Sequence, residues 1–68
     1  MRSTQTYTVT GMTCGHCVAS VTEEVQEITG VEDVAVDLAT GAVTVTSTEP
    51  LDESAVRAAV EEAGYQLA

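Results

Sequence analysis

Two cysteines, Cys14 and Cys17, have the residue type and the spacing in this sequence that are best suited to chemistry. They stand in a C-x-x-C arrangement where a strand pattern ends and a helix pattern begins. This placement can direct both sulfurs toward one point, where they can share a metal ion or form a disulfide. The free N–H groups and the positive dipole end of a helix N-terminus favour the thiolate, the form that binds metals. The sequence therefore predicts a metal-binding or redox-active thiol pair.

The number of sulfur ligands restricts which metal the pair can hold. Structural Zn²⁺ takes four ligands, and the chain has no cysteine beyond these two. Soft thiolates select Cu(I), for which two sulfurs in a near-linear arrangement are sufficient. An exposed site of this kind also leaves room for a thiolate of another protein, which transfer without release of the free ion requires. We therefore predict that Cys14 and Cys17 bind Cu(I).

Four other residues could act beside the sulfurs, and each also has a simpler interpretation. His16 could add a nitrogen ligand or bridge copper in a dimer, but a third ligand would strain so tight a loop, which favours an exposed imidazole. Met12 could offer a thioether, although a buried side chain that supports the loop is favoured. Thr13 could form a hydrogen bond to the backbone near the loop. Tyr65 could shield the site and donate its hydroxyl toward a sulfur, or be an ordinary half-buried ring.

Hydrophobic periodicity predicts the elements that position these residues. Period-two alternation predicts strands over residues 6–10, 34–38 and 42–46. Helical spacing predicts one helix from Gly15 to about Thr29 and a second between an N-cap at Asp52 and Gly64. A short edge strand is expected over 65–68. This order predicts an α+β, ferredoxin-like βαββαβ fold, with two helices packed on one face of a four-stranded antiparallel sheet.

The predicted core is aliphatic because the chain has neither Trp nor Phe. Its expected strand positions are Val34, Val36, Leu38, Val43 and Val45. Its expected helix positions are Val18, Val21, Val25, Ile28, Val56, Ala59, Val60 and Ala63. With 68 residues the chain is expected to form a single domain, 1–68. A core of this size does not favour a deep, water-excluding cleft, so an enzyme is not expected.

The charge balance limits the expected partners. Eleven Asp and Glu residues stand against two Arg and no Lys, for a net charge of −9. Such a surface repels phosphate backbones and anionic lipid, so neither nucleic acid nor direct membrane binding is expected, whereas a basic protein surface would be attracted. The first ten residues contain no apolar leader. A cytoplasmic location is therefore expected, where the thiols stay reduced.

The chain resembles the heavy-metal-associated domain family, and in particular its free-standing bacterial copper chaperones. Two segments carry the resemblance: Gly11-Met12-Thr13-Cys14-Gly15-His16-Cys17 and Ala63-Gly64-Tyr65. The resemblance extends over essentially the whole chain, and implies that Cys14 and Cys17 bind Cu(I) and that Met12 is a buried support for the loop. It implies delivery to a copper-transporting P-type ATPase or exchange with a copper-responsive regulator, by a monomer or a copper-bridged dimer. Family members that bind Zn²⁺ or Cd²⁺ often carry an acid where Thr13 stands, which favours Cu(I).

Two alternatives remain open at this point. The same domain also occurs as an N-terminal metal-binding domain of the copper ATPase itself, although a start at Met1 favours a separate chaperone. A thiol–disulfide oxidoreductase is an alternative of another class, because Cys-Gly-His-Cys is also an active-site tetrapeptide in that chemistry. The chain is too short for a thioredoxin-like fold and has no aromatic residue before the first cysteine, which disfavours this alternative.

Overall fold

The computed structural model describes residues 2–68 and contains six elements in the predicted order. They are β1 (Ser3–Thr10), α1 (Gly15–Gln26), β2 (Val31–Asp37), β3 (Ala42–Ser47), α2 (Glu53–Glu62) and β4 (Gln66–Leu67). Met1, the first residue of the expected domain 1–68, lies outside the described residues. Among residues 2–68, neither helix is long and apolar enough to cross a membrane.

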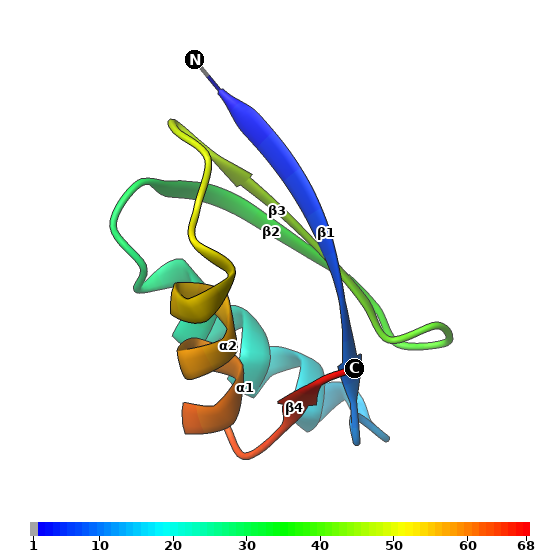
Figure 1. Cartoon of the computed structure of the whole chain (residues 1–68). Coiled ribbons are helices and arrows are strands. Elements are labelled where there is room, and N and C mark those ends of the chain that lie inside the picture. Colours follow the sequence, from blue (N-terminus) through cyan, green and yellow to red (C-terminus); the bar gives the residue numbers. More distant parts are fainter. Residues whose placement is uncertain (1) are drawn as a thin grey trace.

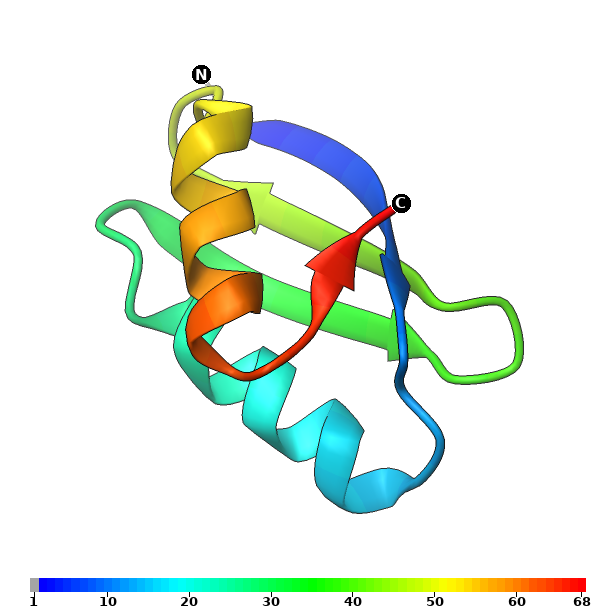
Figure 2. The same ribbon diagram turned by 60° about the horizontal axis from the view of Figure 1, so that its bottom comes forward.

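The four strands form one antiparallel sheet in the order β2-β3-β1-β4. Strand β3 pairs with β1 over six positions, whereas β4 pairs with β1 only at Val9 and Thr10. Both helices lie on the same face of the sheet (Figures 1 and 2). This arrangement confirms the predicted ferredoxin-like fold. Strand β1 lies inside the sheet and leads directly into the segment that carries the cysteines.

Burial of aliphatic side chains between the sheet and the helices holds the fold together. In β1, side chains alternate between the helices and solvent, so that Val9 is buried while Thr8 and Thr10 are exposed. The buried core cluster consists of Val9, Val21, Val25, Val43, Val45, Val56, Ala59 and Val60. Seven of these eight residues are valine, which packs well on a pleated sheet surface and loses little side-chain freedom on burial. The prediction of an aliphatic core is confirmed.

Periodicity predicts that the first helix ends near Thr29, but α1 ends at Gln26. The backbone forms a tighter, 3₁₀-type turn there, because the N–H groups of Glu27 and Ile28 donate hydrogen bonds to the carbonyls three residues earlier. Ile28 still packs against the core from this turn. A helix-like apolar stripe therefore extends past the end of the helix itself. At the start of α2, Asp52 occupies the predicted N-cap position, but its side chain makes no capping hydrogen bond.

Two predicted core positions are wrong. Leu38 is 39% exposed, because β2 ends at Asp37 and Leu38 belongs to the turn that follows. Val18 is only half-buried and lies outside the core cluster. The buried stripe of α1 runs instead through Cys17, Val21 and Val25, at a spacing of four residues. One of the two candidate ligands therefore belongs to the helix face that packs on the sheet.

The strands β1 and β2 begin three residues earlier than their periodicity predicts. Each gains these residues by pairing with β3, whose Ser47 lies opposite Ser3 on one side and Val31 on the other. An irregularity between Val31 and Asp33 interrupts the alternation of β2 at this end. Tertiary pairing thus extends strands through segments where the apolar alternation is weak.

Truncating one buried valine tests this description of the core. We expect Val60→Ala, a fully buried position, to lower the free energy of unfolding by about 2 kcal/mol, because two methyl groups are lost and a cavity remains. The matched control is Val18→Ala, which removes the same atoms from a half-buried helix position and should cost under about 1 kcal/mol. Urea unfolding followed by circular dichroism measures both. Equal losses in the two variants would contradict the core assignment.

Candidate metal centre

The segment between β1 and α1 is held in place by contact with the turn before β4. Pairing of Thr10 with Gln66 brings the C-terminal end of β1 beside the residues that follow α2. Gly11 has φ +92°, which favours glycine, and a Cβ atom there would lie only 3.3 Å from Cδ1 of Tyr65. The Tyr65 ring thus packs closely against Gly11 at the start of the cysteine segment, although the two residues are 54 positions apart along the chain.

The two cysteines occupy different environments at the N-terminus of α1. Cys14 is the N-cap residue with extended backbone angles, and it is exposed. Cys17 lies in the first turn and is 9% exposed. Both are free thiols, and their Sγ atoms are 3.4 Å apart. The pair can therefore share one soft metal ion, with one sulfur anchored in the fold and the other open to a partner.

Several hydrogen bonds stabilise the Cys17 thiolate and lower the pKa of this thiol from 9.0 to about 6. The largest contribution is a hydrogen bond from the backbone N–H of Thr13, followed by those from the Tyr65 hydroxyl and the Cys14 thiol, while partial burial opposes them. The pKa of Tyr65 is raised, first because its hydroxyl is hydrogen-bonded to Cys17. At neutral pH Cys17 is therefore mostly ionised and ready to bind a metal.

The other predicted site residues surround this pair unequally. His16 is exposed on the first turn of α1, and Met12 is half-buried and packs against the core. The Oγ1 atom of Thr13 lies 3.9 Å from the Sγ atom of Cys17. Within residues 2–68, no group of three or more His, Cys, Asp or Glu side chains is placed to hold a metal ion. In the part of the chain that the structure describes, the geometry thus offers two sulfurs without a third ligand of these types.

Two features of the site were missed by sequence reasoning. One is the backbone N–H of Thr13 as a donor to Cys17, for which the sequence contains no signal. The other is the difference in exposure between the two sulfurs. The spacing of Cys17, Val21 and Val25 was a usable signal for the second feature, because residues four apart share one helix face.

The sequence profile of the heavy-metal-associated domain matches residues 6–66. This chain belongs to the heavy-metal-associated domain family. It is 40% identical over 63 residues to Copper-transporting ATPase 1 of Rhizobium meliloti, a match that covers 93% of this chain and 8% of the ATPase. It is also 40% identical over 67 residues to the copper chaperone CopZ of Enterococcus hirae, with 91% of each chain covered. The domain therefore spans only a small part of the ATPase but nearly the whole of CopZ.

Solved structures of the family have the same fold. A structure of a CopZ metallochaperone superposes on this chain with a TM-score of 0.90 at 33% sequence identity, covering 97% of this chain and 100% of the other. The apo N-terminal domain of ZntA superposes with a TM-score of 0.90 at 29% identity, covering 100% and 92%. The same backbone fold is therefore shared by proteins with different names.

The hydrogen bonds to Cys17 predict an unusual thiol titration. We expect one thiolate to form with a midpoint near pH 6 in the reduced metal-free protein, as its pKa is about 6. The variant Tyr65→Phe should move this midpoint upward, because it removes a donor that stabilises the thiolate. The ultraviolet absorbance of thiolate, followed against pH, measures both midpoints.

The chain offers a matched control in its other tyrosine. Tyr7→Phe removes the same hydroxyl group from a side chain that does not interact with the thiols, so the midpoint should stay where it is. An unchanged midpoint in Tyr65→Phe would contradict the assigned hydrogen bond. The lowered pKa of Cys17 also makes the stability of the fold depend on pH. The ionised Cys17 contributes its full stabilisation above pH 9.0, and this stabilisation is lost as the pH falls through about 6.

Proposed function

We propose that this chain binds one Cu(I) ion through Cys14 and Cys17 and passes it to another protein by ligand exchange. The observation that carries the proposal is the pair of Sγ atoms 3.4 Å apart at an exposed helix N-terminus, without a third ligand group among residues 2–68. Soft sulfur ligands in low number select Cu(I) over Zn²⁺. Relatives named as a copper chaperone and as copper-transporting ATPases support this choice of metal.

The unequal exposure of the two sulfurs suggests the order of exchange. A thiolate of the partner approaches from the side of Cys14, which is exposed, and a three-coordinate arrangement of sulfurs forms around the ion. The bond to Cys14 then breaks, a second thiolate of the partner binds the ion, and the bond to the buried Cys17 breaks last. Only metal–sulfur bonds form and break, and copper keeps its oxidation state. The protein acts in this scheme as a carrier and not as an enzyme.

The neighbouring residues have supporting roles in this proposal. The Thr13 N–H and the Tyr65 hydroxyl stabilise the Cys17 thiolate, which reduces competition between protons and the metal. Met12 packs beneath the segment and maintains its shape. His16 is exposed to solvent and is not a ligand of the bound ion.

The proposed partner is a copper-transporting P-type ATPase or a copper-responsive regulator. We place this protein, and the exchange with its partner, in the cytoplasm. Relatives include both a separate chaperone and domains of ATPases, at the same 40% identity. A free-standing chaperone is favoured by the similarity to CopZ over 91% of each chain, and the alternative is the metal-binding domain of the ATPase itself. The monomer is the proposed carrier, and copper-bridged dimerisation is the alternative.

Substitution of the cysteines tests the two-thiolate site. We expect the wild-type protein to bind one Cu(I) per monomer, and Cys14→Ser or Cys17→Ser to lower the affinity by orders of magnitude, because one of two ligands is lost. His16→Ala is the control from the same turn and should retain the wild-type affinity. Competitive titration of the reduced protein with Cu(I) and Zn²⁺, with native mass spectrometry for stoichiometry, measures these values. Tight Cu(I) binding by either cysteine variant would overturn the proposal.

The charge of the chain predicts that transfer depends on salt. With a net charge of −9, approach to a basic partner surface is accelerated by electrostatic steering. Because the screening length falls from ~30 Å at 0.01 M to ~8 Å at 0.15 M ionic strength, we expect the transfer rate to fall over this range. Stopped-flow measurement with the metal-binding domain of a copper ATPase as acceptor tests this. A rate that does not change with salt would exclude steering.

A further inference from the structure

The outer edge of β1 is covered along only part of its length. Strand β4 pairs with Val9 and Thr10, and the N–H of Ala68 donates a hydrogen bond of 2.8 Å to the carbonyl of Thr8. From Ser3 to Tyr7, no strand of the described chain pairs with this edge. Figure 1 shows β4 beside only the C-terminal end of β1. Among residues 2–68, about half of this long strand therefore has no partner at this edge, which is called the open edge below.

The backbone groups that point to this open edge can be assigned by alternation. The N–H of Val9 donates to Gly41, on the β3 side, whereas the carbonyl of Thr8 accepts from Ala68 on the β4 side. In an antiparallel sheet, successive residues direct their N–H and C=O groups to opposite sides. Thr4 and Thr6 therefore direct theirs to the open edge. These are the groups with which an added strand pairs.

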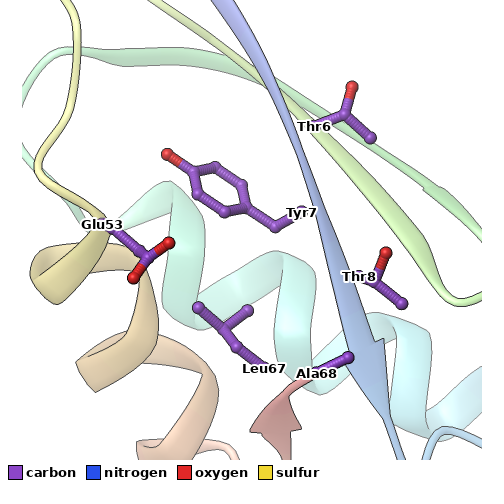
Figure 3. A pocket seen from close by; sticks show the side chains of 6 residues that line it. All are labelled: Thr6, Tyr7, Thr8, Glu53, Leu67 and Ala68. Carbon is purple, nitrogen blue, oxygen red and sulfur yellow. The ribbon is translucent and has the colours of Figure 1, made fainter.

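A cavity of about 290 Å³ lies along this edge, directly past the end of β4. Its walls are formed by Thr6, Tyr7, Thr8, Glu53, Leu67 and Ala68. Figure 3 shows Tyr7 and Leu67 extending from the two strands on the side where α2 presents Glu53. An extended segment that continues the line of β4 would place a side chain in this cavity, beside Tyr7, Leu67 and the carboxylate of Glu53.

The net charge of the chain favours a basic occupant, while the one carboxylate that lines the cavity, that of Glu53, already has an arginine partner. The Glu53 side chain is 66% exposed, and Arg57 contacts one of its oxygens, Oε2, at 2.9 Å. Arg2, at the start of β1, pairs across the sheet with Glu32 of β2 at 2.9 Å. A second copy of this chain carries the same net charge of −9 and would be repelled. A positively charged segment would be attracted to the same edge.

We propose that the open edge of β1, from Ser3 to Tyr7, binds an extended peptide segment of a partner protein as an added antiparallel strand. A basic side chain of that segment lies in the cavity against Glu53, with its alkyl part on Tyr7 and Leu67. This surface contains neither cysteine, so the proposal does not depend on the metal chemistry. It gives the protein a second point of contact with a partner.

The probe for this surface is a capped six-residue peptide of alternating threonine and valine with one central lysine. Added to the reduced ¹⁵N-labelled protein, it should produce saturable amide shifts at Thr4, Thr6 and Glu53. A peptide methylated on alternate backbone nitrogens should not bind, because it cannot pair with the edge. Replacing the lysine by glutamate, or Glu53→Gln in the protein, should weaken binding, by about fivefold for the peptide change.

Two substitutions at one position provide a matched comparison. Thr6→Pro removes the N–H that points to the open edge, and proline is tolerated where that group faces solvent, so peptide binding should be lost while the fold is kept. Thr6→Val loses the hydroxyl, which lies 3.3 Å from that of Thr44, but keeps the N–H and should bind as the wild type does. If Thr6→Pro does not fold, the methylated peptide decides the question in the wild-type protein.

Several results would overturn the proposal. These are the absence of saturable shifts, shifts confined to the outer edge of β2, or equal binding of the methylated peptide. Shifts along β1 that depend on protein concentration without peptide would show that a second copy occupies the edge. Equal affinity for the lysine and glutamate peptides would contradict the basic occupant.

Discussion

Burial of one stripe of α1 against the sheet is the constraint on which the candidate site depends. Cys17, Val21 and Val25 follow one another at a spacing of four residues, and all three are buried. The packing that stabilises the fold therefore also determines where one sulfur lies. Cys14, one turn earlier and at the N-cap, has no such anchor and remains exposed. This packing therefore places a buried, fixed sulfur beside an exposed one.

The thiolate at this site is stabilised by hydrogen bonds and not by basic side chains. Both arginines of the chain are paired with glutamates, Arg2 with Glu32 and Arg57 with Glu53. The donors to Cys17 are instead a backbone N–H, the Tyr65 hydroxyl and the Cys14 thiol. Such donors act at short range and leave the outer surface free to stay acidic. The strongly negative chain can thus hold an ionised sulfur at one end.

The acidic character has its own effect within the fold. The pKa of Glu24 is raised, first by partial burial and then by the nearby charges of Glu27, Glu62 and Glu23. Glu23 and Glu24 lie on α1, Glu27 directly follows it, and Glu62 ends α2, which packs beside α1 on the sheet (Figure 2). Their mutual repulsion opposes the helix packing, so the valine core must outweigh it. The fold tolerates this repulsion, with few positive charges to offset it, because burial of apolar side chains is the main stabilising term.

Much of the fold and the position of the candidate site could be predicted from local pattern. Periodicity indicates each element and most of the core, because side-chain spacing decides which residues can share one face of a strand or helix. The C-x-x-C pair can be recognised from the sequence for the same reason, since its two cysteines are near neighbours along the chain. The pattern failed at Leu38. This side chain is exposed because β2 ends one residue earlier, at Asp37.

Other features were decided only by the tertiary structure. The sequence left open whether Tyr65 lies beside the thiols, and the pairing of β4 with the end of β1 decides it by placing the ring against Gly11. The open edge of β1 likewise arises from the difference in length between β1, with eight residues, and β4, with two. Periodicity shows which face of a strand is buried, but it does not show which strand lies beside it or how far the pairing extends. Those are properties of segments distant in the sequence, which only folding brings together.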